Sequence, residues 1–246
     1  MKFLEKIRQK AKDNYAEGVC IAFLGDSVTH GCFEIYKTPD GLDGIYDRNG
    51  SYVQCFANMM EKLFPSVPLH IINAGIGGDN ARIGATRVER DVLRYQPDLV
   101  VVCYGLNDCA EFERYIPRYV NALSEIFDKI RASGCDVIFM TPNMMNTEIS
   151  PHLTEPSFIE TAKMTAQRQN SGMFDKHLDA AKALCREKGV PVCDCYAVWK
   201  MLDRGGVNVT ELLCNQINHP CREMHRVFAY ELIKTIFSLE ASESHE

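Results

Sequence analysis

The sequence has no long apolar run and no excess of positive charge. None of its apolar runs approaches the ~18 residues of a membrane-spanning helix. Charges recur every two or three residues in "LEKIRQKAKD" near the N-terminus, where a signal peptide would need an apolar core. The net charge is −6, whereas proteins that bind nucleic acids usually carry a basic face. We therefore expect a cytoplasmic protein that binds neither membranes nor nucleic acid.

Metal-binding cysteine pairs and phosphate-binding glycine motifs are also missing. Of the eleven cysteines, Cys193 and Cys195 lie close in sequence, and Cys214 and Cys221 flank His219. Neither pair has the Cys-x-x-Cys spacing of structural zinc sites. The stretch "GIGGDN" lacks the Gly-x-Gly-x-x-Gly spacing of dinucleotide-binding turns. We expect free thiols, no metal and no other cofactor, and a nucleotide or flavin binder is disfavoured.

Five short apolar runs alternate with segments of helical period. The runs are rich in Val, Ile and Cys, as is typical of strands covered on both faces; they are 19–24, 69–73, 99–104, 137–140 and 190–195. Between them, apolar residues recur every three or four positions, for example in 52–63, 116–130 and 224–236. This alternation predicts an α/β fold, a single-domain three-layer α/β/α sandwich with a five-stranded parallel sheet of flavodoxin-like type. One domain should cover 1–240, and 241–246 should form a frayed tail.

Two segments are longer than plain connections require. They span 32–50 and 143–172, and in the second Ser157 followed by Glu160 predicts the capped start of a short extra helix. Long loops in compact domains are usually functional walls or lids. We therefore expect both segments to border the functional site.

Polar residues follow three of the predicted strands and precede the last helix. Asp26 and Ser27 follow the first strand, "NAGIGGD" (73–79) ends the second, "YGLND" (104–108) follows the third, and "NHP" contains His219. In an open parallel sheet, ligands bind beyond the carboxyl ends of the strands. A hydroxyl, glycine amides, a carboxamide and an imidazole at one edge are the components of a nucleophilic acyl-transfer site.

In these four blocks the chain resembles the SGNH or GDSL hydrolase family over nearly its whole length. "GDSVT" matches the first block and implies that Ser27 is the nucleophile, while "NHP" matches the region of the catalytic histidine, here His219. "NAGIGGD" and "GLND" match the middle blocks and single out Gly78 and Asn107. The resemblance implies an oxyanion hole made of the amides of Ser27 and Gly78 and the carboxamide of Asn107.

The activity that this resemblance implies is that of a serine esterase or acylhydrolase. It would remove a short acyl group, such as acetyl, from a small-molecule or carbohydrate ester through an acyl-enzyme on Ser27. A serine hydroxyl is a poor nucleophile until a base takes its proton, and the ordinary pKa of histidine suits His219 to this task near neutral pH.

Each of these residues also has a plainer interpretation. Ser27 could simply cap a helical turn, Gly78 could only permit a positive φ, and Asn107 could only brace its loop. Asp26 and Asp108 are expected to tie loops together through backbone amides.

Two other histidines compete with His219 for the role of base. His30 lies too near Ser27 in sequence to be favoured, and His225 is expected to pack or to cap a helix.

The aspartate that the family usually has three residues before the histidine is absent. Gln216 occupies that position, and Glu211, the nearest carboxylate, lies eight residues upstream of His219. The acid normally holds the imidazole in one tautomer and stabilises its charged form. We therefore predict a Ser27–His219 dyad oriented by Gln216 or by a backbone carbonyl in 214–217, with lower turnover than a full triad. The aspartate would also be absent from a catalytically weakened binding protein of this fold, which is the alternative function.

Overall fold

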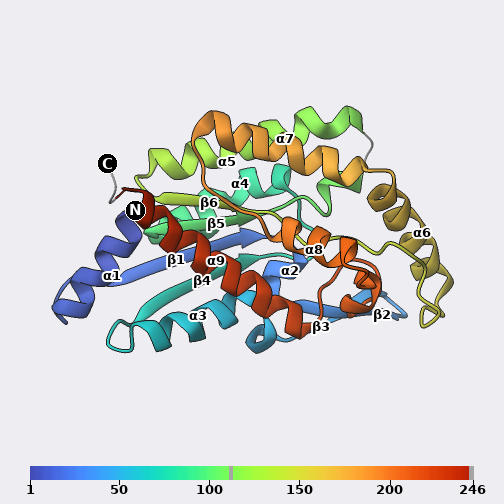
Figure 1. Ribbon diagram of the computed structural model, residues 1–246, viewed down its shortest axis with the longest axis horizontal. Helices are drawn as coiled ribbons and strands as arrows, with labels where there is room; N and C mark the ends of the chain where they lie inside the picture. The colour runs from blue at the N-terminus through green and yellow to red at the C-terminus, as the bar shows by residue number, and fades with distance from the viewer. Residues whose placement is uncertain (111–112, 244–246) are drawn as a thin grey trace.

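The computed structural model describes residues 1–110 and 113–243, in which strands and helices alternate (Figure 1). The strands are β1 (Val19–Gly25), β2 (Cys32–Thr38), β3 (Gly41–Tyr46), β4 (Leu69–Gly75), β5 (Leu99–Cys103), β6 (Asp136–Met140) and β7 (Val192–Cys193). The helices are α1 (Lys2–Lys12), α2 (Ser27–His30), α3 (Tyr52–Leu63), α4 (Ala81–Asp91), α5 (Ile116–Ala132), α6 (Pro156–Asn170), α7 (Met173–Lys188), α8 (Cys195–Arg204) and α9 (Arg222–Glu243).

Five of the strands form one parallel sheet in the order β4-β1-β5-β6-β7. This confirms the predicted five-stranded parallel sheet. The run predicted as a strand over 190–195 is shorter than expected, because Asp194 caps α8 by accepting a hydrogen bond from the Ala197 amide. The register aligns the ends of three neighbouring strands, since Gly25 of β1 lies beside Gly75 of β4 and Cys103 of β5.

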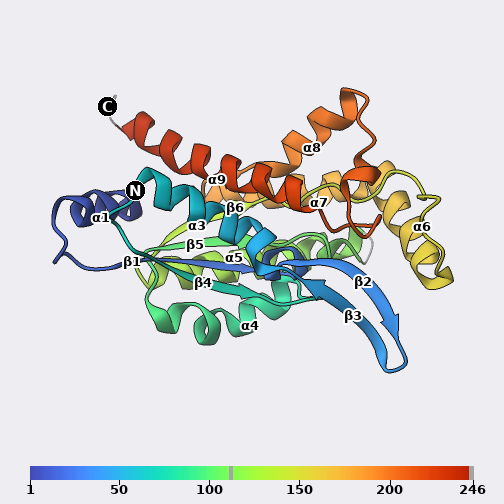
Figure 2. The same cartoon turned by 90° about the horizontal axis from the view of Figure 1, so that it is seen from below.

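Helices cover both faces of the sheet (Figure 2). On one face lie α1, α3 and α9, and on the other lie α4 and α5, with α7 beside α5. The side chains of β1 alternate accordingly: Ile21 and Phe23 belong to the apolar cluster of the first face, and Ala22 and Leu24 to that of the second. The three-layer sandwich is thus confirmed, and both faces of β1 are buried.

The segment 32–50 is a hairpin where the sequence predicted only a long loop. Strands β2 and β3 pair antiparallel and extend away from the parallel sheet (Figure 2). The sequence did contain a signal for this, because Pro39-Asp40-Gly41 is a typical turn between two extended runs. Lys37 of the hairpin forms an ion pair of 2.5 Å with Glu155, the residue before α6.

The segment 143–172 contains the expected extra helix, but Ser157 does not cap it. The helix α6 begins at Pro156, whose missing N–H and fixed φ suit the first helical position. Ser157 lies inside the first turn and its hydroxyl donates to the Glu155 carboxylate at 3.2 Å. At the other end of the chain, α9 runs to Glu243, which lies within the predicted tail, while 244–246 fall outside the described residues.

Candidate active site

Ser27 opens a single helical turn directly after β1, which lies between β4 and β5 in the sheet. The carboxylate of Asp26 accepts a hydrogen bond from the Val28 amide at 3.0 Å, and Gly31, with a φ of +88°, ends the turn. From β4, the Asn73 side chain donates to the Thr29 carbonyl at 2.8 Å. The turn is thus held from both ends, which places Ser27 at the carboxyl edge between β4 and β5.

His219 reaches Ser27 from a tight loop just before α9. The Asn215 side-chain oxygen accepts hydrogen bonds from the backbone amides of Ile217, Asn218 and His219, at 3.1, 2.9 and 2.8 Å. This asparagine turn directs the imidazole toward the sheet, and His219 Nε2 lies 2.9 Å from Ser27 Oγ. The structure therefore brings together two residues that are 192 positions apart in the sequence.

The other ring nitrogen of His219 identifies the tautomer. His219 Nδ1 lies 2.9 Å from the backbone carbonyl oxygen of Phe33. Because a carbonyl oxygen only accepts hydrogen bonds, Nδ1 carries the proton and Nε2 is left as the acceptor for the Ser27 hydroxyl. Burial lowers the pKa of His219, against opposing contributions from the Phe33 carbonyl and the Glu34 carboxylate. The imidazole is thus uncharged at pH 7, and its Nε2 is able to accept a proton.

The prediction that Gln216 orients His219 is wrong. Gln216 has a φ of +58°, and its side-chain amide donates to the Leu213 carbonyl at 2.9 Å. A backbone carbonyl does hold the ring, but it belongs to Phe33 in β2 and not to residues 214–217. A main-chain acceptor 186 residues away leaves no side-chain pattern in the sequence, which is why sequence reasoning missed it.

The two competing histidines have other partners. His225 Nδ1 accepts a hydrogen bond from the Tyr52 amide at 2.9 Å, so it caps the start of α3, and burial lowers its pKa to about 3. The ring of His30 packs on that of Tyr46, with 4.5 Å between the centroids. Neither imidazole is hydrogen-bonded to Ser27, whose partner is His219, in agreement with the expectation for both.

The proposed oxyanion residues lie beside Ser27. Gly78 has a φ of +75° in a turn closed by a hydrogen bond of 3.2 Å from the Asp79 amide to the Ile76 carbonyl. A Cβ at Gly78 would meet open space, so the turn needs glycine for its backbone conformation. The Asn107 carboxamide donates to the Asp79 carbonyl at 2.8 Å, which joins the loops after β4 and β5.

These residues line one cleft of about 450 Å³. Ser27, Gly78, Asn107 and His219 form its floor. The walls come from the hairpin and from α6, the two segments that the sequence predicted as borders of the site; they include Ile35, Leu42, Asp43, Tyr46, Phe158 and Thr161.

Asp26 and Asp108 brace the strand ends through backbone amides. Asp26 caps the turn of Ser27, and Asp108 accepts a hydrogen bond of 3.0 Å from the Ala81 amide at the start of α4. Burial raises the pKa of each carboxyl to about 7. Neither is bonded to His219, so neither acts as the acid of a triad.

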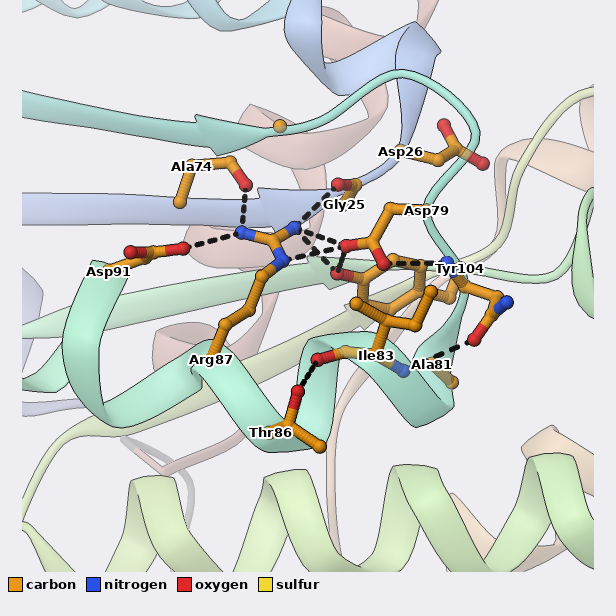
Figure 3. Close-up of polar contacts among 12 residues, drawn as sticks. Gly25, Asp26, Ala74, Asp79, Ala81, Ile83, Thr86, Arg87, Asp91 and Tyr104 are labelled. Atoms are coloured by element: carbon orange, nitrogen blue, oxygen red, sulfur yellow. Dashed lines mark hydrogen bonds and ion pairs between the residues drawn. The ribbon is translucent and has the colours of Figure 1, made fainter.

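A buried ion pair fixes the turn that contains Gly78 (Figure 3). Arg87 of α4 binds the Asp79 carboxylate, which also accepts a hydrogen bond of 2.7 Å from the Tyr104 hydroxyl. The same guanidinium donates to the carbonyls of Gly25 at 3.0 Å and Ala74 at 2.7 Å. Arg87 thus connects the ends of β1 and β4 to the turn before α4. Sequence reasoning missed it, because a lone arginine in a helix resembles a surface residue.

The structure contains no metal cluster and no membrane-spanning helix within the residues it describes. No three His, Cys, Asp or Glu side chains there come close enough to hold a metal ion. In the same part of the chain, none of the helices has the length and apolar character needed to cross a bilayer.

Comparison with known proteins places this arrangement among esterases. The profile of the GDSL-like Lipase/Acylhydrolase family matches residues 23–227. An acetylxylan esterase of Geobacillus stearothermophilus is 26% identical over 169 residues, which cover 64% of this chain and 76% of that protein.

Two solved structures share the fold at low sequence identity. A catalytic mutant of Axe2, an acetylxylan esterase from Geobacillus stearothermophilus, has a TM-score of 0.65 at 18% identity and covers 89% of this chain and 95% of its own. A two-domain esterase active on acetylated mannans has a TM-score of 0.65 at 20% identity. The match covers 96% of this chain but only 52% of that esterase, so this chain spans about half its length.

Replacement of Arg87 by methionine tests the buried network. Arg87→Met leaves the Asp79 carboxylate buried without its cation, which typically costs about 3–5 kcal/mol. We expect a loss of unfolding free energy of this size in urea denaturation. Arg90→Met is the matched control, because Arg90 pairs with Asp91 on the exposed side of the same helix, and such pairs contribute about 0–1 kcal/mol. Equal losses for the two variants would contradict the assigned role.

Proposed function

The chain belongs to the GDSL-like lipase and acylhydrolase family, and we propose that it hydrolyses acetyl esters of carbohydrates through an acyl-enzyme on Ser27. The observation that carries this proposal is the distance of 2.9 Å between Ser27 Oγ and His219 Nε2 at the floor of a cleft that also contains Gly78 and Asn107. These are the nucleophile, base and donor groups that acyl transfer requires.

In the acylation step, His219 Nε2 accepts the Ser27 proton as Oγ attacks the ester carbonyl. The Phe33 carbonyl keeps the proton on Nδ1, so that Nε2 faces the hydroxyl. The negative charge on the substrate oxygen is stabilised by the amides of Ser27 and Gly78 and by Asn107. Asn107 Nδ2 carries two hydrogens and donates one to the Asp79 carbonyl, which leaves the other for the substrate oxygen.

Collapse of this intermediate releases the alcohol and leaves the acyl group on Ser27. His219, now protonated, gives its proton to the leaving alkoxide. Water then attacks the acyl-enzyme with His219 again as base, and the carboxylic acid leaves. The same hydrogen bonds serve both halves of the reaction.

The substrate class is supported by the relatives and by the cleft. Two of the similar proteins are described as an acetylxylan esterase and an esterase active on acetylated mannans. The cleft walls combine apolar side chains with Asp43, Asn215 and Asn218, a mixture suited to a sugar, which offers both apolar faces and hydroxyls. A cytoplasmic site of action remains a prediction from the sequence.

Turnover of aryl acetates and acetylated xylo-oligosaccharides separates an esterase from a weakened binding protein. We expect the wild type to hydrolyse both, and Ser27→Ala and His219→Ala to lose at least about 10³-fold in kcat, as nucleophile and base deletions do. Glu211→Gln is the control, because Glu211 is exposed and is not part of the site. Residual activity in Ser27→Ala equal to that of wild type would refute the proposal, and wild-type binding without turnover would favour the alternative.

Asn107→Ala tests the oxyanion hole separately. Loss of one donor typically lowers kcat by about 10²- to 10³-fold, and we expect KM to change far less, because the charge exists only in the transition state. Asn58→Ala, on an exposed face of α3, serves as the matched control. A variant that raises KM but keeps kcat would assign Asn107 to ground-state binding instead.

A further inference from the structure

We propose that two neighbouring residues of β2 divide the work of the missing aspartate: the Phe33 carbonyl orients His219, and the carboxylate of Glu34, held by Arg222, stabilises the charged imidazole. This inference rests on the proposed function of Ser27 and His219. A triad acid performs both tasks with one side chain. Here a backbone oxygen makes the hydrogen bond, and a side chain one residue further along supplies the charge.

Arg222 binds both ends of the hairpin from the first turn of α9. Its Nη1 lies 2.8 Å from Glu34 Oε1, and its Nε lies 2.8 Å from Asp47 Oδ2. Its guanidinium also lies over the ring of Phe33, 4.2 Å from the centroid. Arg222 follows His219 by only three residues. The segment that contains the base therefore also binds β2, whose Phe33 carbonyl orients the imidazole.

The partners of Arg222 are themselves fixed. The Asp47 amide donates to the Gly31 carbonyl at 2.9 Å, which ties the end of the hairpin to the turn of Ser27. On its other side, the Phe33 ring packs against His225, with 4.7 Å between the centroids. The Phe33 side chain is therefore held by Arg222 and His225, which supports the position of its carbonyl at His219 Nδ1.

The charged neighbour that raises the pKa of His219 is Glu34, which follows Phe33 in β2. The hydrogen bond from Arg222 lowers the pKa of Glu34 and also that of Asp47, so both are ionised at neutral pH. His225 and Cys214 also face His219, but burial lowers the pKa of His225 to about 3 and raises that of Cys214 to about 12, so both are neutral. Two carboxylates and one guanidinium remain charged.

The negative charge of Glu34 acts during proton transfer from Ser27 to His219. When Ser27 gives its proton to Nε2, His219 becomes a cation, and the negative charge of Glu34 favours that form. Glu34 and Arg222 are about one-third exposed, at 37% and 38%, so solvent and salt screen the effect. Glu34 does not line the cleft that contains Ser27, so it is a positioning residue that acts through His219.

The alternative is that Arg222 and Glu34 only fasten the hairpin to α9. Glu34→Gln distinguishes the two, because glutamine keeps the size and one acceptor oxygen for Arg222 while it removes the charge. The titration of His219 is followed by NMR of labelled histidine in a Ser27→Ala background, and the pH profile of kcat/KM in the active enzyme. Glu211→Gln is the control that removes one charge from an exposed residue eight positions upstream of His219.

We expect Glu34→Gln to lower the pKa of His219 and to move the acid limb of kcat/KM to lower pH. The kcat should fall about fivefold with little change in KM, and the shift should shrink in 1 M salt because the ions screen partly exposed charges. Glu211→Gln should leave the titration unchanged. A His219 titration in Glu34→Gln that matches that of Glu211→Gln overturns the inference.

A second variant covers the case in which Glu34→Gln folds poorly. Arg222→Lys keeps the positive charge but cannot bind Glu34 and Asp47 through one planar fork. We expect this variant to lower kcat more than it raises KM. A variant with the kcat of the wild type would contradict the role of Arg222 in holding Glu34 and Asp47. Since the NMR titration needs no turnover, it tests the inference even if Ser27→Ala were to retain activity, an outcome that would refute the proposed function instead.

Discussion

The ion pair between Arg87 and Asp79 is the interaction on which the geometry of the site depends. It lies at the carboxyl edge of the sheet, where the guanidinium also binds the carbonyls of Gly25 in β1 and Ala74 in β4. Buried backbone carbonyls need hydrogen-bond donors, and a buried guanidinium with five N–H groups binds several of them at once. The cost of burying the charge is offset by the carboxylate and the Tyr104 hydroxyl (Figure 3). Through Asp79, this network fixes the turn of Gly78 and the carboxamide of Asn107.

The hairpin adds a second constraint that the parallel sheet alone would not supply. It forms one wall of the cleft, and its first strand provides the carbonyl that orients His219. A single hairpin after the Ser27 turn thus lines the cleft and supplies the carbonyl that binds His219 Nδ1 where no aspartate does. The absence of that aspartate is therefore compatible with an imidazole that is held in one orientation and can accept the Ser27 proton.

The fold was largely predictable from the sequence, and the site only in part. Apolar runs indicate buried strands, and apolar residues at helical spacing indicate buried helix faces. The parallel sheet and its layers could therefore be predicted from local patterns. Side chains at the strand ends were also recognisable, because Ser27, Asn107 and His219 stand in short motifs. The Phe33 carbonyl was not, because every residue has a carbonyl and only the fold determines which one meets a histidine. Likewise, the burial of Arg87 depends on contacts with three separate segments, which no local pattern records.

Labelling by a fluorophosphonate tests most directly whether Ser27 and His219 form a working nucleophile and base. Such a probe is attacked by an activated serine and leaves a stable adduct whose position peptide mass spectrometry identifies. The account predicts one adduct per chain, on Ser27, with labelling abolished in Ser27→Ala and strongly slowed in His219→Ala. A folded wild-type protein that takes up no label at Ser27, or that labels equally fast without His219, would contradict it.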